Sequence, residues 1–135
     1  QRPGGAQCLA ECIRTLRDGG GREAVRAVAT MRYGYDVSET CDEIRRTNRF
    51  DETCQVTVPQ SIVCFLESTD FEQAVRLAIS IGGDSDTIAA MTGSLAEAFY
   101  GIPDAIARQA LACLTQEMRD VVIPFIAQRP IQLIR

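Results

Sequence analysis

The stretch Ser80–Pro103, SIGGDSDTIAAMTGSLAEAFYGIP, contains the helix on which the fold depends. Past its first turn the predicted helix, residues 86–100, carries one charged side chain, Glu97. Its bulky residues are Ile88, Met91, Leu95 and Phe99, and most of the others are small. A helix that is apolar nearly all round is normally buried among other helices. The stretch therefore predicts an all-α fold assembled around this helix.

Helical periodicity continues on both sides of it. Apolar residues at three- and four-residue spacing predict helices over residues 6–16, 22–32, 58–66, 71–79, 104–114 and onward from 116. The less regular segment 35–55 is expected to hold one short helix over 38–46 and then a loop. We expect Thr69 and Glu72 to form a capping box, Pro59 to lie in the first turn of its helix, and Pro124 to kink or end the last helix. With no strand pair, repeat or linker predicted, residues 1–135 are expected to form one domain.

The composition limits the chemistry that the chain can carry. All 14 basic residues are Arg, and there is no His, Lys or Trp. Without His, a bound metal must rely on oxygen ligands or thiolates. The formal net charge of −4 gives no reason to expect a nucleic-acid partner. The six cysteines form no C-x-x-C pair, and most of them lie in apolar helical patterns, which favours buried, reduced thiols in a cytoplasmic protein. No apolar run is long enough to span a membrane.

Gly82-Gly83-Asp84-Ser85-Asp86-Thr87 is the stretch most suggestive of a site. In one interpretation Asp84 or Asp86 only caps the following helix. In the other interpretation, the turn is part of a metal site. A helix cap needs only one carboxylate, whereas this turn has two carboxylates and a hydroxyl. Two close carboxylates repel each other, and a divalent cation that prefers oxygen ligands, such as Mg²⁺, would relieve that repulsion. Neither a calcium EF-hand loop nor a phosphate-binding glycine motif fits the spacing.

Three segments of the sequence resemble segments of the ADP-ribosylglycohydrolases, and they follow one another in the same order as in that family. The family includes the dinitrogenase-reductase-activating glycohydrolase. The three segments are GGAQCLAECIRTL (4–16), YGYDVSETCDEIRRTNRFDETCQVTVPQSIVCFLESTDFEQAVRLAI (33–79) and AISIGGDSDTIAAMTGSLAEAFYGIP (78–103). The resemblance implies an all-α hydrolase that uses two Mg²⁺ or Mn²⁺ ions to cleave the glycosidic bond between ADP-ribose and a modified residue. By motif, it implies Asp84, Asp86 and Thr87 as metal ligands. It further implies Gly82, Gly83, Ser85, Phe50, Asp51, Thr53 and Gln55 as substrate-binding residues.

The chain departs from the family pattern in one large respect. Family members are about twice as long, and their N-terminal half supplies a Thr-Asp-Asp metal motif and a catalytic acidic residue that have no counterpart here. The chain therefore resembles the C-terminal half of such an enzyme, and its catalytic residues stay unassigned. Two hypotheses remain open. In the first, the chain supplies half of a dinuclear site and acts on ADP-ribosylated protein, with a missing N-terminal half or a second copy as partner. In the second, it is a non-catalytic module that binds ADP-ribose or metal, or that oligomerises.

Overall fold

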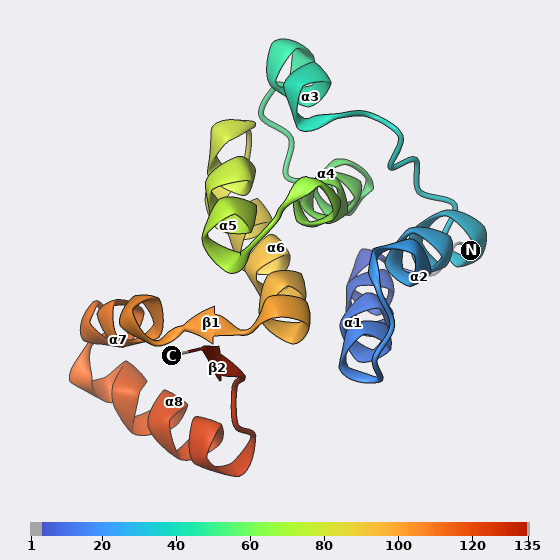
Figure 1. Cartoon of the computed structure of the whole chain (residues 1–135). Helices are drawn as coiled ribbons and strands as arrows, with labels where there is room; N and C mark the ends of the chain where they lie inside the picture. The colour runs from blue at the N-terminus through green and yellow to red at the C-terminus, as the bar shows by residue number, and fades with distance from the viewer. Residues whose placement is uncertain (1–3, 135) are drawn as a thin grey trace.

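The computed structural model describes residues 4–134, and most of them are helical (Figure 1). The helices are α1 (Gly5–Arg17), α2 (Arg22–Ala27) with a π-helical turn η1 (Val28–Arg32), α3 (Cys41–Thr47), α4 (Cys54–Glu67), α5 (Phe71–Ser80), α6 (Ser85–Tyr100), α7 (Asp104–Ala112) and α8 (Gln116–Gln128). Two short strands, β1 (Ile102–Pro103) and β2 (Leu133–Ile134), pair in parallel. The predicted all-α class is confirmed.

Helix α6 lies at the centre of the bundle and packs against α1, α4 and α5 (Figure 1). Its side chains Ile88, Leu95 and Ala96 are fully buried. Thr92 is buried as well, and its hydroxyl donates to the carbonyl of Ser61 on α4 at 3.1 Å. One face of this helix is buried as expected, whereas Ala90 and Ser94 on the opposite face are exposed. The Gly82–Asp84 turn lies at the N-terminal end of this central helix.

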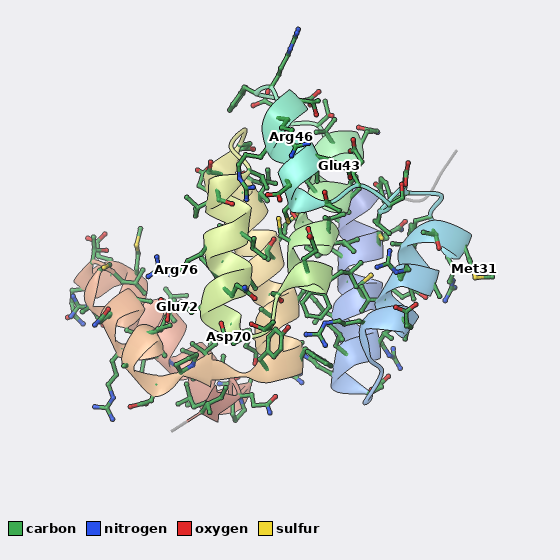
Figure 2. The ribbon with its side chains drawn as sticks, turned by 45° about the horizontal axis from the view of Figure 1, so that its top comes forward. Met31, Glu43, Arg46, Asp70, Glu72 and Arg76 are labelled. Atoms are coloured by element: carbon green, nitrogen blue, oxygen red, sulfur yellow. The ribbon has the colours of Figure 1, made fainter. Side chains whose placement is uncertain are left out.

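The start of α5 differs from the expected capping box. The N-cap residue is Asp70, whose carboxylate accepts from the backbone N–H of Gln73 at 2.7 Å. Thr69 lies one residue earlier, and the amide oxygen of Gln73 accepts from both its N–H and its hydroxyl. Asp70 marks the start of α5 in Figure 2, with Glu72 and Arg76 paired one turn apart on the same helix. The prediction was wrong by one residue, because Asp at the cap position competes with Thr for the same orphan N–H groups.

The expectation for Pro59 was also wrong, and of the two alternatives for Pro124 the structure excludes that it ends its helix. Helix α4 begins at Cys54, so Pro59 lies inside it and not in its first turn. Helix α8 passes through Pro124 and continues to Gln128. A proline removes one backbone hydrogen bond from a helix and crowds the carbonyl four residues earlier, yet α4 and α8 stay helical on both sides of their prolines.

The C-terminal part forms an arm of α7 and α8 beside the bundle (Figure 1). It returns to the bundle through the β1–β2 pair, a small exception to the expected absence of strands. Glu97 holds this return: its carboxylate pairs with Arg17 at 2.7 Å and accepts from the N–H of Gln132 at 3.0 Å. The one charged side chain of α6 past its first turn is therefore buried with two partners, as a buried charge requires.

Among residues 4–134, no helix has the length and apolar character needed to cross a membrane. The six cysteines are all free thiols, of which Cys54 and Cys113 are exposed.

Candidate functional site

Two glycines shape the turn between α5 and α6. Gly82 and Gly83 each have a φ of 76°, in the left-handed region that favours glycine. A Cβ atom on Gly83 would lie 3.0 Å from Nδ2 of Asn48, whereas a Cβ atom on Gly82 would meet nothing within 4 Å. The glycine pair thus lets the backbone reverse direction and pass close to the loop that contains Asn48.

Asp84 occupies the N-cap position of α6, yet its carboxylate accepts no capping hydrogen bond. The backbone explains this, because a capping side chain usually needs an extended residue, and Asp84 has φ −78° and ψ 71°. The interpretation of Asp84 as a simple cap was therefore wrong. Its half-buried carboxylate is left for another role.

Asp86 lies two residues further, at the exposed side of the first turn. Its pairing with the Asp84 carboxyl lowers the pKa of Asp86, and hydrogen bonds from backbone N–H groups lower it further. One of these donors is the N–H of Thr87, 3.0 Å from Oδ1 of Asp86. The structure therefore brings the two predicted metal-binding carboxylates together, with the exposed Thr87 next in the chain.

These oxygen atoms fit a hard divalent cation in kind but not in number. Carboxylate and hydroxyl oxygens are the ligands that Mg²⁺ and Mn²⁺ take in proteins. Within residues 4–134, however, no group of three or more His, Cys, Asp or Glu side chains is arranged to hold a metal ion. Asp84, Asp86 and Thr87 could hold part of a coordination shell, and the remaining ligands must be water or come from outside these residues.

The loop after α3 supports the turn through hydrogen bonds that the sequence did not predict. Nδ2 of Asn48 donates to the carbonyl of Ile81 at 2.8 Å, and Oδ1 of Asn48 accepts from Gln60 at 3.0 Å. Arg45 of α3 holds the residue before Ile81: it donates to the carbonyl of Ser80 at 3.2 Å and to the hydroxyl of Ser80 at 2.7 Å. Nothing in the local sequence distinguishes Asn48 from an ordinary polar loop residue.

The residues predicted to bind substrate fall into two groups. Gly82, Gly83 and Ser85 form the turn itself, and the N–H of Ser85 donates to the carbonyl of Gly83. Phe50, Asp51, Thr53 and Gln55 lie in or just after the loop that begins at Asn48. In the described part of the chain none of these four hydrogen-bonds to the turn; Asp51 instead accepts from the N–H of Thr53 at 2.8 Å. Phe50 lies within the loop that begins at Asn48, and its side chain is 70% exposed.

A cavity of about 430 Å³ lies on the other side of Gln60. Its walls come from the start of α1, from residues 33–39 and from the first half of α4, and they include Tyr33, Tyr35, Gln55 and Gln60. Gln60 lines the cavity and donates to Asn48, and Asn48 in turn donates to Ile81. Asn48 is therefore the hydrogen-bonded link between the cavity wall and the glycine turn. Of the residues predicted to bind substrate, Gln55 lines this cavity; the two tyrosines were not predicted.

Comparison with known proteins defines the class to which this helical bundle and its glycine–aspartate turn belong. The sequence model of the family described as ADP-ribosylglycohydrolase matches residues 4–133. The chain belongs to the ADP-ribosylglycohydrolase family.

Individual relatives match over a shorter part. The chain is 32% identical to ADP-ribosylhydrolase ARH3 of Bos taurus, over 49% of this chain and 21% of the bovine protein. The proteins of the same name from Homo sapiens and Mus musculus are 31% and 32% identical over the same shares. The match therefore spans about a fifth of the length of these curated relatives. No solved structure matches the chain.

Proposed function

We propose that this chain contributes Asp84, Asp86 and Thr87 to the divalent-metal site of an ADP-ribosylglycohydrolase, which hydrolyses the glycosidic bond between ADP-ribose and a modified residue. The observation that carries the proposal is the position of Asp84. Its carboxylate lies beside that of Asp86 at the end of the central helix and is not used as a cap. Membership of the family supports the same assignment.

Each part of the turn would have a defined task. The Asn48 and Arg45 hydrogen bonds hold the backbone at Ser80 and Ile81, so that the carboxylates keep their positions. Asp84 and Asp86 supply the negative charge that attracts the cation. When bound, a pair of Mg²⁺ or Mn²⁺ ions would orient the ribose hydroxyls and lower the pKa of a water molecule. The remaining ligands and the catalytic acid or base would come from an N-terminal half or from a second copy.

The surroundings of the turn suit ADP-ribose or an ADP-ribosylated protein. We place the ligand along Gly82, Gly83 and Ser85, whose compact backbone leaves room for a close approach. Asp51, Thr53 and Gln55 offer polar groups on the neighbouring segment, and the exposed ring of Phe50 could stack on a planar group. We also propose a cytoplasmic location, since all six cysteines are free.

The alternative is a non-catalytic module of the same family that binds ADP-ribose or metal, or that oligomerises. One observation favours it: within the described residues only two carboxylates meet at the turn, fewer than a closed metal site requires. In this alternative the chain would bind its ligand and release no product.

Calorimetric titration with Mn²⁺, with and without ADP-ribose, tests the proposal. We expect weak Mn²⁺ binding that ADP-ribose strengthens, and we expect Asp84→Asn to weaken it at least tenfold because half of the local negative charge is lost. Asp18→Asn is the matched control, since Asp18 is an exposed carboxylate whose one described ion pair is with Arg14. Equal Mn²⁺ binding by the unsubstituted chain and by Asp84→Asn would contradict the proposed site.

An assay of ADP-ribose release from an ADP-ribosylated protein then separates the two functions. The enzyme hypothesis predicts Mn²⁺-dependent release when an N-terminal half is added. Binding of ADP-ribose without any release in that mixture favours the non-catalytic module.

A further inference from the structure

Cys41 and Cys64 meet in the core although 23 positions separate them in the sequence. Their sulfur atoms are 3.8 Å apart. Cys41 is the first residue of α3 and is 3% exposed, and Cys64 lies in the second half of α4 and is fully buried. A disulfide requires the sulfur atoms to approach to about 2 Å. A shift of less than 2 Å in the short helix α3 would bring them within bonding distance.

The other cysteines do not offer such a pair between two elements. Cys8 and Cys12 are neighbours on consecutive turns of α1, so a bond between them would fasten no second element. Cys54 and Cys113 are exposed on α4 and just after α7. Cys41 and Cys64 are thus the pair whose oxidation would join two helices.

We propose that Cys41 and Cys64 form a reversible disulfide that fastens α3 to α4 when the protein meets a low-molecular-weight disulfide such as oxidised glutathione. One protein thiolate attacks the oxidant, forming a mixed disulfide and releasing one glutathione thiolate. The second cysteine then gives up its proton and attacks the protein-bound sulfur, releasing the second glutathione. Two S–H bonds of the protein are lost, one S–S bond forms, and two electrons pass to the oxidant, which ends as two thiols.

The closed structure protects the pair until α3 moves. The hydrogen bond with the Cys64 sulfur and then burial raise the pKa of Cys41, and the nearby Glu67 carboxylate acts in the same direction. The reactive thiolate is therefore scarce while the helix is packed. Helix α3 has only seven residues and is joined to the rest by non-helical segments, which makes it the natural place for local opening.

Fastening α3 would also fix the support of the glycine turn. Arg45 in α3 and Asn48 directly after it hold Ser80 and Ile81. At the other end of α3, the N–H of Cys41 donates to the carboxylate of Glu67 on α4, and the disulfide would add a covalent link between the same two helices. We therefore expect oxidation to slow amide exchange in α3 and at the turn.

The test uses the full chain with the two exposed cysteines replaced, Cys54→Ser and Cys113→Ser, to prevent side reactions. After incubation of the folded protein with oxidised glutathione, we expect the intact mass to fall by two hydrogens and a linked peptide to contain Cys41 and Cys64. Reductant should restore the original mass. Hydrogen exchange monitored by mass spectrometry should show slower exchange in α3 in the oxidised form.

Matched variants make the result specific. Adding Cys41→Ser or Cys64→Ser should abolish the linked peptide, whereas adding Cys8→Ser and Cys12→Ser should leave it in place. The proposal is overturned if both cysteines stay reduced, if each carries only glutathione, or if the link involves another cysteine. The measurement on the chain that retains both cysteines decides the matter even where a variant fails to fold.

Discussion

Asp70 and Asp84 stand at the same position of two consecutive helices but use their carboxylates differently. Asp70 is fully extended, with φ −156° and ψ 175°, and caps α5 through the N–H of Gln73. Asp84 follows two glycines in the left-handed region, has a ψ of 71°, and makes no capping hydrogen bond with its carboxylate. The preceding backbone, and not the residue type, decides which aspartate is free to bind a ligand.

Gly83→Ala tests how closely the turn approaches Asn48. Alanine at a positive φ costs roughly 1–2 kcal/mol of folding free energy. Gly82→Ala is the matched control, because Gly82 has the same φ of 76° but no neighbour within 4 Å of its Cβ position. We expect Gly83→Ala to lower the free energy of unfolding, measured by urea denaturation, more than Gly82→Ala does. Equal losses for the two variants would mean that Asn48 does not restrict the turn.

At the scale of single elements, α3 shows how a short helix is held by its ends. Thr40 and Glu43 form a capping box at its start, with the Glu43 carboxylate 2.7 Å from the N–H of Thr40. Arg45 and Asn48 fasten its end to the glycine turn. Glu43 and Arg46, both exposed, are labelled on this helix in Figure 2. Because seven residues are too few for a stable isolated helix, these contacts and the burial of Cys41 and Ile44 determine whether α3 forms.

The capping box makes α3 sensitive to acid. Hydrogen bonds from the N–H and hydroxyl of Thr40 lower the pKa of Glu43 below its usual value of 4.5. A carboxylate with a lower pKa in the folded state contributes stability that is present above pH 4.5 and is lost as the pH falls through the folded-state pKa. We therefore expect amide exchange in α3 to accelerate relative to other helices as the pH is lowered through this window.

Glu43→Gln checks that sensitivity, because the amide oxygen can still accept from Thr40 but does not titrate in this range. The variant should show a smaller acid-induced acceleration in α3 once intrinsic exchange rates are corrected for pH. Glu39→Gln is the control: Glu39 is exposed and makes no hydrogen bond in the described part of the chain. If both variants keep the full acid response, the capping box is not its source.

At the scale of the whole molecule, apolar surface remains uncovered in two places. A shallow groove crosses α6 between α1 and α5, and its lining includes Ile13, Val75, Ala90 and Gly93. On the arm, helix α8 has no buried residue, and Val121 and Phe125 are 71% and 63% exposed. Contiguous apolar surfaces of this kind usually mark a contact with another protein segment.

We expect the chain to associate with itself through the groove on α6, because association would remove its apolar lining from water. Sedimentation velocity should show reversible association that increases with concentration. Ala90→Glu places a charge in the groove and should shift the equilibrium towards monomer, whereas Ala110→Glu, on an exposed position of α7, should not. A chain that sediments as a monomer at high concentration would contradict this expectation.

The bundle is the part of the molecule that the sequence predicted best. The three- and four-residue spacing of apolar side chains located most of the helices, and the near absence of charge in residues 86–100 identified the central one. Such patterns report on local structure, since they reflect which face of each helix avoids water. They failed where two local preferences competed, as for Thr69 and Asp70 at the start of α5, and where Pro59 lay inside α4 and not in its first turn.

By itself, then, the sequence determined the all-α class, the central helix, the family and the candidate carboxylates Asp84 and Asp86. Only the tertiary structure decided that Asp84 does not cap its helix, that Asn48 supports the turn and that Cys41 meets Cys64. It also decided that Glu97 pairs with Arg17, 80 positions away in the sequence. The physical reason is common to all of these: local spacing sets which residues share a helix face, whereas contacts between distant residues depend on how the helices pack against one another.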